Sequence, residues 1–169
     1  MIISAFPACG KTYAFEKMKD IKGLKVLDSD SSQFSWIEKL NDAGWINSAL
    51  ANTQYPIKIR NPEFPTNYIK HIKNSMDSHH YIFVSSHKVV RDAMKENNIS
   101  YVLIYPDRRL LDTWIGRCYV RGNDKEFVDT LIENWDKWIT ECEAEDGCTE
   151  KIKLQYNQYL MDVIEERSR

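Results

Sequence analysis

The chain has 169 residues, a formal charge of −2 and four cysteines. This length predicts one domain with a single hydrophobic core, spanning residues 1–169. The near-zero charge argues against nucleic acid or an anionic membrane as a partner, and no apolar run reaches the roughly 20 residues of a membrane span. The cysteines lack metal-ligand spacing, and the apolar start is too short for a signal peptide. We therefore expect a reduced, cytoplasmic protein that is a monomer or homodimer.

The first twelve residues, MIISAFPACGKT, predict a turn between a strand and a helix. Met1–Phe6 is an apolar run long enough for one buried strand, Pro7–Cys9 interrupts it, and a helical stretch follows from Tyr13 to Lys19. The P-loop pattern G-x-x-x-x-G-K-[ST] is met over residues 5–12, except that Ala5 replaces the first glycine. A chance GKT after a hydrophobic run is the alternative, but the strand before it and the helix after it favour a phosphate-binding turn.

The chemistry of such a turn assigns roles to its residues. Backbone N–H groups can curl around a phosphate, because a helix N-terminus leaves its first donors unpaired. Gly10 lets the backbone approach closely, Lys11 places an ammonium against the β/γ-phosphates, and the Thr12 hydroxyl can ligate Mg²⁺. The residues expected around the nucleotide are Pro7, Ala8, Cys9, Gly10, Lys11, Thr12, Tyr13 and, from a later helix, Arg117.

A second short strand, Leu24–Leu27, delivers two carboxylates at its carboxyl end, where open α/β sheets place ligand chemistry. Asp28 and Asp30 can hold Mg²⁺, directly or through water, and can orient or deprotonate a substrate hydroxyl. We assign Asp28 to the metal, with Thr12. The alternative for the pair is a helix cap and turn. Apolar spacing then predicts a helix from Gln33 to Asn41.

The next segment is a candidate acceptor-binding insertion, residues 44–77. Residues 44–65 contain three prolines and are predicted to be irregular, and Thr66–Met76 is predicted to be a helix. Arg60 could grip a phosphate of the acceptor, or it could be a solvated surface arginine.

Tyr81–Val84 is almost wholly apolar and is predicted to be a third strand inside the sheet. It leads into Ser86 rather than into the aspartate of a Walker B strand, so the metal-supporting carboxylate is expected after the second strand instead. A helix from Val89 to Lys95 carries Arg91, which can point back toward the sheet edge. The residues expected to contact the acceptor are Asp30, Arg60, Ser86 and Arg91.

A fourth strand, Ser100–Tyr105, precedes a helix from Arg108 to Val120. Arg117 and Arg121 lie four residues apart and therefore on one helix face. Beside a mobile Gly-Asn turn they can close over a triphosphate and neutralise transition-state charge, which makes residues 117–124 a candidate short lid. A salt-bridged helix end is the alternative.

The remaining pattern completes the fold class. Lys125–Glu143 is predicted to be a long helix whose aromatic stripe faces the core, Ile152–Gln155 a last strand, and Gln158–Glu166 a closing helix. Alternating strands and helices predict an α/β fold, a P-loop NTPase three-layer sandwich with a five-stranded parallel sheet and helices on both faces.

The order of these parts resembles the P-loop small-molecule kinases, that is, nucleoside monophosphate kinases such as adenylate kinase, with the shikimate and gluconate kinases as cousins. Phe6–Thr12 resembles the kinase P-loop, and Asp28–Asp30 resembles the D-x-D after the second strand of shikimate kinases, which implies contacts with Mg²⁺ and a substrate hydroxyl. Small phage or bacterial proteins labelled as nucleotide kinases are similar in kind. The architecture covers nearly the whole chain, whereas the motifs cover only short segments.

Two further segments are similar to these kinases. Ser86–Asp92 is loosely similar to the segment after the third strand of gluconate kinases. Arg117–Arg121 resembles the R-x-x-x-R at the lid of adenylate kinases, which implies nucleotide stacking for Arg117 and phosphate contact for Arg121. The chain departs from these families at Ala5, at the missing aspartate after the third strand, and in a lid of only a few residues without zinc-binding cysteines.

Together these features predict an ATP- and Mg²⁺-dependent phosphotransferase for a small acceptor, with a nucleoside monophosphate or nucleoside as the first candidate. The residues expected to carry catalysis are Lys11, Asp28, Asp30, Arg117 and Arg121. The alternative from another class is a nucleotide-binding regulatory or interaction protein with little turnover. A further hypothesis concerns Cys9: a helix N-terminus and Lys11 would lower the pKa of its thiol, and oxidation would then block nucleotide binding.

Overall fold

Five parallel strands form the main sheet of the computed structural model, which describes residues 1–39 and 57–167. Their spatial order is β2-β5-β1-β6-β7. Their bounds are β1 (Ile2–Ala5), β2 (Val26–Asp28), β5 (Tyr81–Ser85), β6 (Val102–Pro106) and β7 (Glu150–Leu154). The buried strand β1 lies in the middle, because Ile2 pairs with Ile82 on one side and Ile3 pairs with Val102 on the other. The predicted α/β class with a five-stranded parallel sheet is confirmed.

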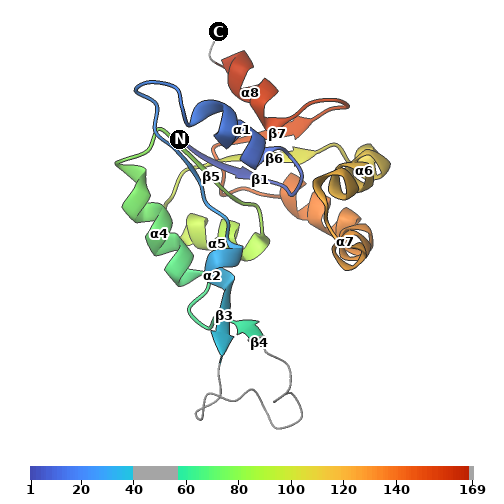
Figure 1. The fold of residues 1–169 in the computed structure, drawn as a ribbon, viewed down its shortest axis with the longest axis horizontal. Helices are drawn as coiled ribbons and strands as arrows, with labels where there is room; N and C mark the ends of the chain where they lie inside the picture. The colour runs from blue at the N-terminus through green and yellow to red at the C-terminus, as the bar shows by residue number, and fades with distance from the viewer. Residues whose placement is uncertain (40–56, 168–169) are drawn as a thin grey trace.

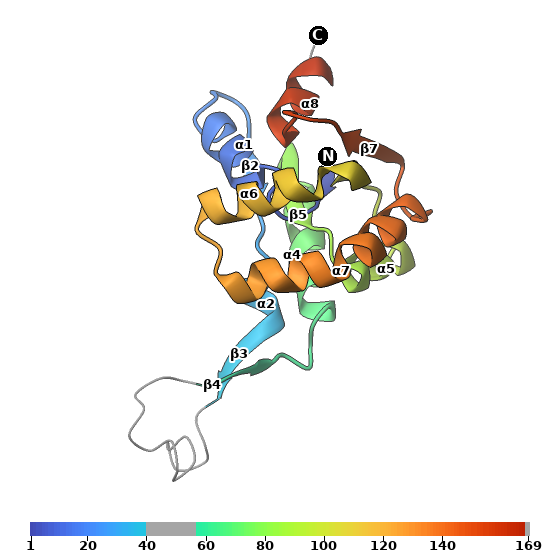
Figure 2. The same cartoon turned by 90° about the vertical axis from the view of Figure 1, so that its right-hand side faces the viewer.

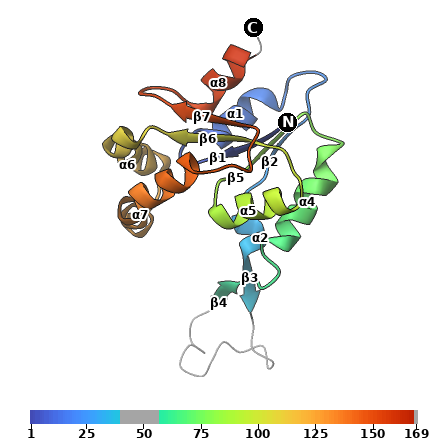
Figure 3. The same ribbon diagram turned by 180° about the vertical axis from the view of Figure 1, so that it is seen from behind.

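Helices lie on both faces of this sheet, as in a three-layer sandwich (Figure 1). The helices α1 (Lys11–Met18) and α8 (Leu160–Arg167) pack together on one face, and α4 (Thr66–Met76) and α5 (Lys88–Glu96) pack together on the other. A 3₁₀ turn, η1 (Arg108–Leu110), leads into α6 (Leu111–Arg121), which lies beside α7 (Lys125–Glu143), as Figure 3 also shows. None of the helices in the described ranges combines the length and apolar character that crossing a bilayer requires.

The longest helix, α7, has the bounds that its periodicity predicts, and its apolar stripe packs into the core. The buried residues of the stripe are Val128, Leu131, Trp135, Ile139 and Cys142. Trp135 meets Phe6 edge to face, with ring centroids 5.7 Å apart and planes at 85°. Phe6 directly follows β1, so this contact seats α7 against the carboxyl end of the central strand.

The segment after β2 differs from its prediction. The helix predicted over Gln33–Asn41 is wrong beyond Ser35, because α2 (Ser32–Ser35) ends there and Trp36–Lys39 forms strand β3. The prediction of irregular structure is wrong for Ile57–Arg60, which forms β4 and pairs with β3 in antiparallel register. Figure 2 shows this hairpin projecting from the helical layers. Residues 40–56, which include much of the candidate acceptor-binding insertion, lie outside the described residues.

The physical reason is long-range pairing. Trp36 has an extended backbone, with φ −127° and ψ 143°, and it stands opposite Arg60 in the ladder. The Arg60 guanidinium lies 4.3 Å from the centroid of the Trp36 ring, a cation–π contact between cross-strand neighbours. The apolar residues Trp36 and Ile37, which suggested a helix face, therefore belong to strand β3. Its partner β4 follows residues 40–56 in the chain.

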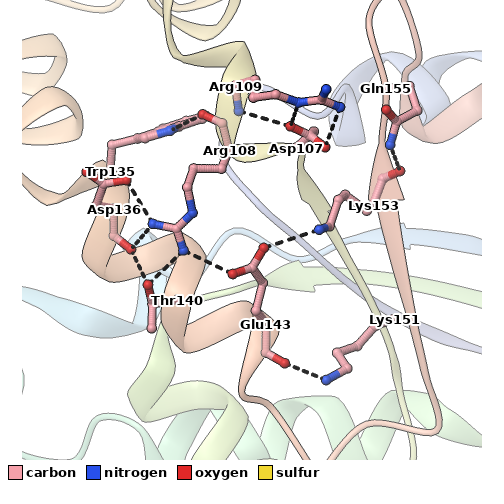
Figure 4. A network of polar contacts seen from close by, with 10 residues as sticks. All are labelled: Asp107, Arg108, Arg109, Trp135, Asp136, Thr140, Glu143, Lys151, Lys153 and Gln155. Atoms are coloured by element: carbon pink, nitrogen blue, oxygen red, sulfur yellow. Dashed lines mark hydrogen bonds and ion pairs between the residues drawn. The ribbon is translucent and has the colours of Figure 1, made fainter.

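A polar network fastens the outer side of α7 to the last two strands (Figure 4). Arg108 donates to Asp136 at 2.8 Å and to Glu143 at 3.0 Å, both on α7. Glu143 also accepts from Lys153 of β7 at 3.2 Å. On the inner side, the indole N–H of Trp135 donates to the Arg108 carbonyl at 2.8 Å. The residue at the start of η1 is thus held by both faces of α7, which fixes the helix relative to β6 and β7.

The packing of α7 predicts that substitutions at two neighbouring positions change the free energy of unfolding by different amounts. Leu131 is fully buried and Ile132 is 43% exposed. We expect Leu131→Ala to lower the free energy of unfolding by about 2–5 kcal/mol, because it leaves a cavity. The control Ile132→Ala should change it by about 0.5 kcal/mol or less. Urea unfolding followed by circular dichroism measures both, and equal losses would show that α7 does not bury the predicted stripe.

Candidate phosphate-binding site

The turn between β1 and α1 has the curled backbone that phosphate loops use. Ala8 has φ 59° and Gly10 has φ 94°, so two left-handed residues alternate with ordinary ones just before α1. Successive N–H groups in such a turn converge and form a concave site for an anion. Gly10 is suited to its position because a side chain would be strained at this φ. Ala8 carries a Cβ and pays a strain energy for the same conformation.

Hydrogen bonds from distant elements hold the carbonyl groups of this turn outward. The indole N–H of Trp114 in α6 donates to the Pro7 carbonyl at 2.8 Å, and the Leu160 N–H at the start of α8 donates to the Cys9 carbonyl at 2.9 Å. In a trans peptide the C=O and the following N–H point in opposite directions. The N–H groups that follow these two carbonyls therefore point to the other side of the turn.

A cavity of about 490 Å³ lies against this turn. Its lining residues are Ala8, Gly10, Lys11, Thr12, Tyr13, Gly116, Arg117, Val120, Arg121 and Tyr159. The structure thus brings the predicted phosphate-loop residues and both predicted lid arginines to one cavity. Of the residues predicted around the nucleotide, Pro7 and Cys9 do not line the cavity. Their carbonyl groups accept the two hydrogen bonds that hold the turn.

Lys11 lines this cavity. Its Nζ donates to the Ala5 carbonyl at 2.8 Å, so the side chain folds back over the turn. Burial lowers the pKa of Lys11 from its usual value, while the nearby Asp28 raises it. A desolvated ammonium gains more from a hydrogen bond to an anion than a surface lysine does.

Thr12 lines the cavity, whereas Asp28 does not line it but contacts Thr12. The Thr12 hydroxyl donates to Asp28 Oδ2 at 3.0 Å. Adjacent ligands of octahedral Mg²⁺, with bonds of about 2.0–2.1 Å, lie about 2.9 Å apart, so these two oxygens fit neighbouring positions on that ion. The described ranges contain no cluster of three or more His, Cys, Asp or Glu residues that could hold a metal. Mg²⁺ needs no such cluster, because it keeps several waters and binds substrate phosphates.

Tyr68 of α4 positions the loop that carries the aspartates. Its hydroxyl donates to the Ser29 carbonyl at 2.7 Å and accepts from the Ser85 N–H at 3.4 Å, which joins the ends of β2 and β5. Burial raises the pKa of Tyr68 to about 12, so the hydroxyl remains a donor. Asp30 Oδ1 accepts from the Ser32 N–H at 2.9 Å and therefore closes the turn into α2.

Arg117 is enclosed by two aromatic rings. Its guanidinium carbon lies 4.1 Å from the Trp114 ring centroid and 3.8 Å from that of Tyr159, and Nη2 donates to the Gln158 carbonyl at 3.0 Å. Nε and Nη1 are buried and have no hydrogen-bond partner. Arg121, one turn later, is exposed at the cavity.

The candidate lid is the last turn of α6 followed by a closed connection. Gly122 has φ 87°, and its N–H donates to the Tyr119 carbonyl at 2.9 Å. The Asn123 N–H donates to the Cys118 carbonyl at 3.0 Å, and the Asp124 side chain caps α7. These bonds form a Schellman cap, so any closing motion here would involve the helix ends as well as the turn.

A second cavity, of about 300 Å³, is lined by Phe6 and Pro7 at the end of β1. It brings together the predicted acceptor residues Ser86 and Arg91 with four residues of α7: Lys137, Trp138, Glu141 and Cys142. Arg60 lines neither cavity and packs on the hairpin instead.

Arg91 in this second cavity is 2% exposed and largely engaged within the protein. It pairs with Glu145 at 2.8 Å, and its Nη1 donates to the Ser86 carbonyl at 2.9 Å and to Cys142 Sγ at 3.2 Å. Only Nη2 is without a partner. Arg91 therefore positions the loop after β5, and its remaining nitrogen is buried.

His87 marks the space between the two cavities. Part of the residue is exposed, yet desolvation lowers the pKa of its ring, and the nearby cations Lys11, Arg60 and Arg91 lower it further. Asp30 acts in the opposite direction. The His87 ring therefore lies where the fields of three cations combine.

Some lining residues were not among those predicted. Tyr159 falls within the predicted closing helix, Gln158–Glu166, yet it lies just before α8 and lines the first cavity. Trp138 was assigned to the core stripe, yet it lines the second. The available signal for Tyr159 is its place in the loop after β7, because the carboxyl ends of all parallel strands meet at one edge.

A scan of the chain against models of known protein families finds no match, and a search of curated proteins finds no similar sequence. The resemblance to small-molecule kinases therefore stays a prediction from the motifs and their order.

The environment of Cys9 contradicts the hypothesis of a reactive thiol. The residue is fully buried, and desolvation raises the pKa of its thiol to about 12, which outweighs the opposing effect of Lys11. Cys118 and Cys142 are also buried, and Cys148 alone is partly exposed.

This arrangement predicts the pattern of thiol labelling. With a chromogenic disulfide reagent at pH 8, we expect one thiol of the native protein to react rapidly and four to react in denaturant, because burial protects three. In Cys148→Ser the rapid phase should disappear. A rapid phase that persists in this variant and is suppressed by ATP would restore the redox hypothesis for Cys9.

Proposed function

We propose that this protein is an ATP- and Mg²⁺-dependent phosphotransferase acting on a small acceptor. The observation that carries the proposal is the left-handed turn at Ala8 and Gly10, with its carbonyls held outward and Lys11 at the edge of a cavity of about 490 Å³. Unpaired N–H groups, a helix N-terminus and a desolvated ammonium together favour a polyanion such as a nucleotide triphosphate.

The proposed roles follow from position. Lys11 binds the terminal phosphates, and Arg121 at the end of α6 lines the same cavity and would pair with them. Thr12 and Asp28 hold Mg²⁺, which when bound neutralises charge on the phosphate oxygens. Asp30 stands next along the loop, where it could orient a hydroxyl nucleophile, whereas a phosphate acceptor would need no general base.

The second cavity is the proposed acceptor site, because Pro7 of the turn after β1 lines it. Its lining includes Lys88 and Lys137 as well as the carboxylate of Glu141, so it offers both cationic and anionic groups to a small polar molecule. A volume of about 300 Å³ limits the acceptor to a small metabolite or nucleotide.

One observation favours the second candidate, a nucleotide-binding regulator with little turnover. Strand β5 ends in Ser85, where a Walker B strand carries a carboxylate. Titration with Mg²⁺·ATP followed by an acceptor screen for ADP release separates the two, because a regulator binds ATP without acceptor-dependent release.

Removing the ammonium tests the proposal. We expect Lys11→Ala to abolish phosphoryl transfer and to weaken ATP binding roughly 10- to 100-fold, because a charge-assisted hydrogen bond contributes about 1.5–3 kcal/mol. Calorimetric titration and ADP release measure the two effects. Lys19→Ala, at the exposed far end of α1, is the matched control. Wild-type behaviour of Lys11→Ala in both assays would refute the proposal.

The pH dependence of ATP affinity gives a second test. Burial lowers the pKa of Lys11 below its usual value of 10.5, so in the free protein the ammonium loses its proton at a lower pH than an ordinary lysine. We expect ATP affinity to fall as pH rises through this lowered pKa. The affinity of Lys11→Ala should lack this loss, and parallel pH profiles for the two proteins would show that another group titrates.

A further inference from the structure

We propose that Tyr159 supplies the surface on which the nucleobase stacks, and that Arg117 holds Tyr159 instead of stacking on the base itself. This inference rests on the proposed function, because it concerns the base of the bound nucleotide. It revises the role that the adenylate kinase resemblance implies for Arg117.

The first step is the position of Tyr159 beside the phosphate loop. A Cβ at Gly10 would lie 3.5 Å from Tyr159 Cδ1, so the ring edge rests on the turn. The following residue, Leu160, donates its N–H to the Cys9 carbonyl at 2.9 Å, and the Tyr159 N–H donates to Asp162 at 2.7 Å. The backbone of Tyr159 is thus fixed relative to the N–H groups that would bind phosphate.

The second step is that both faces of the Arg117 guanidinium are covered. Trp114 lies at 4.1 Å and Tyr159 at 3.8 Å, and Trp114 is itself fully buried and bonded to Pro7. A guanidinium between two rings has no free face for a base. The bond from Nη2 to the Gln158 carbonyl also ties it to the segment that carries Tyr159.

The third step is the surface that Tyr159 leaves open. One face of its ring lies against Arg117, yet the residue is 42% exposed and lines the cavity. The neighbouring walls include Gly116, which has no side chain to obstruct a flat group, and the apolar Val120. A flat heteroaromatic ring fits this wall, with the triphosphate directed toward Lys11.

Tyr13 is the competing surface, because it also lines the cavity and is 56% exposed. Its ring is approached by Lys17 at 5.5 Å, and it stands in the first turn of α1, immediately after Thr12. Tyr13 thus directly follows the proposed metal ligand in the chain, whereas Tyr159 comes from the loop after β7 and its ring lies against Arg117 of α6.

The experiment compares Mg²⁺·ATP with Mg²⁺·tripolyphosphate, which has the phosphates without a base. Dissociation constants are measured by calorimetry for the wild type and for Tyr159→Ala, Tyr159→Phe, Tyr13→Ala and Tyr156→Ala. Tyr156 is the matched control, because it lies in the same loop, is 66% exposed and does not line the cavity.

We expect Tyr159→Ala to weaken ATP binding roughly 5- to 150-fold, the range for removing one base–aromatic stack. The dissociation constant of tripolyphosphate should change by no more than about twofold. Tyr159→Phe and Tyr156→Ala should bind both ligands like the wild type. The affinity of Tyr159→Ala for GTP should fall by the same factor as its affinity for ATP, because stacking discriminates little between bases.

Three outcomes would overturn the inference. Unchanged ATP affinity in Tyr159→Ala, or a selective ATP loss in Tyr13→Ala alone, would place the base elsewhere. Equal losses of ATP and tripolyphosphate in Tyr159→Ala would show that the ring only supports the phosphate loop. Failure of the wild type to bind ATP, GTP or tripolyphosphate would refute the proposed function as well, and is distinguishable from the first two.

Discussion

The hydrogen bonds that hold the turn after β1 with its carbonyls outward are the interactions on which the rest of the site depends. The Pro7 carbonyl is held from α6 and the Cys9 carbonyl from the start of α8. On the strand side, the Phe6 N–H donates to the Ile104 carbonyl of β6 at 2.9 Å. The loop is therefore shaped by three elements that lie far from it in the chain, and its free N–H groups are a consequence of their packing.

The same edge of the sheet concentrates charge at an energetic cost. Lys11 is desolvated, Arg117 has two buried nitrogens without partners, and His87 faces several cations. Desolvated cations are stabilised by an opposite charge, which is the physical ground on which we propose a phosphate ligand for this region.

The sequence predicted those features that local residues determine. Gly10, Lys11 and the flanking strand and helix specify the turn, and the periodicity of α7 specified its bounds and buried face. Long-range contacts were beyond local patterns. The strand at Trp36 needs a partner at Arg60, and the place of Tyr159 depends on the packing of Arg117 between two rings. Arg91 has a charged side chain typical of a binding residue, but its buried partner Glu145 could not be read from spacing.

The bond between Leu160 and Cys9 has a consequence for biosynthesis. The turn between β1 and α1 is synthesised before Leu160, whose N–H group fixes the Cys9 carbonyl. At about 5–20 residues per second, the nascent loop waits roughly 10–30 s for this donor. During that interval β1 also lacks its later neighbours. Under the proposed function, the site for a nucleotide is therefore complete only once the part of the chain that carries Leu160 has been added.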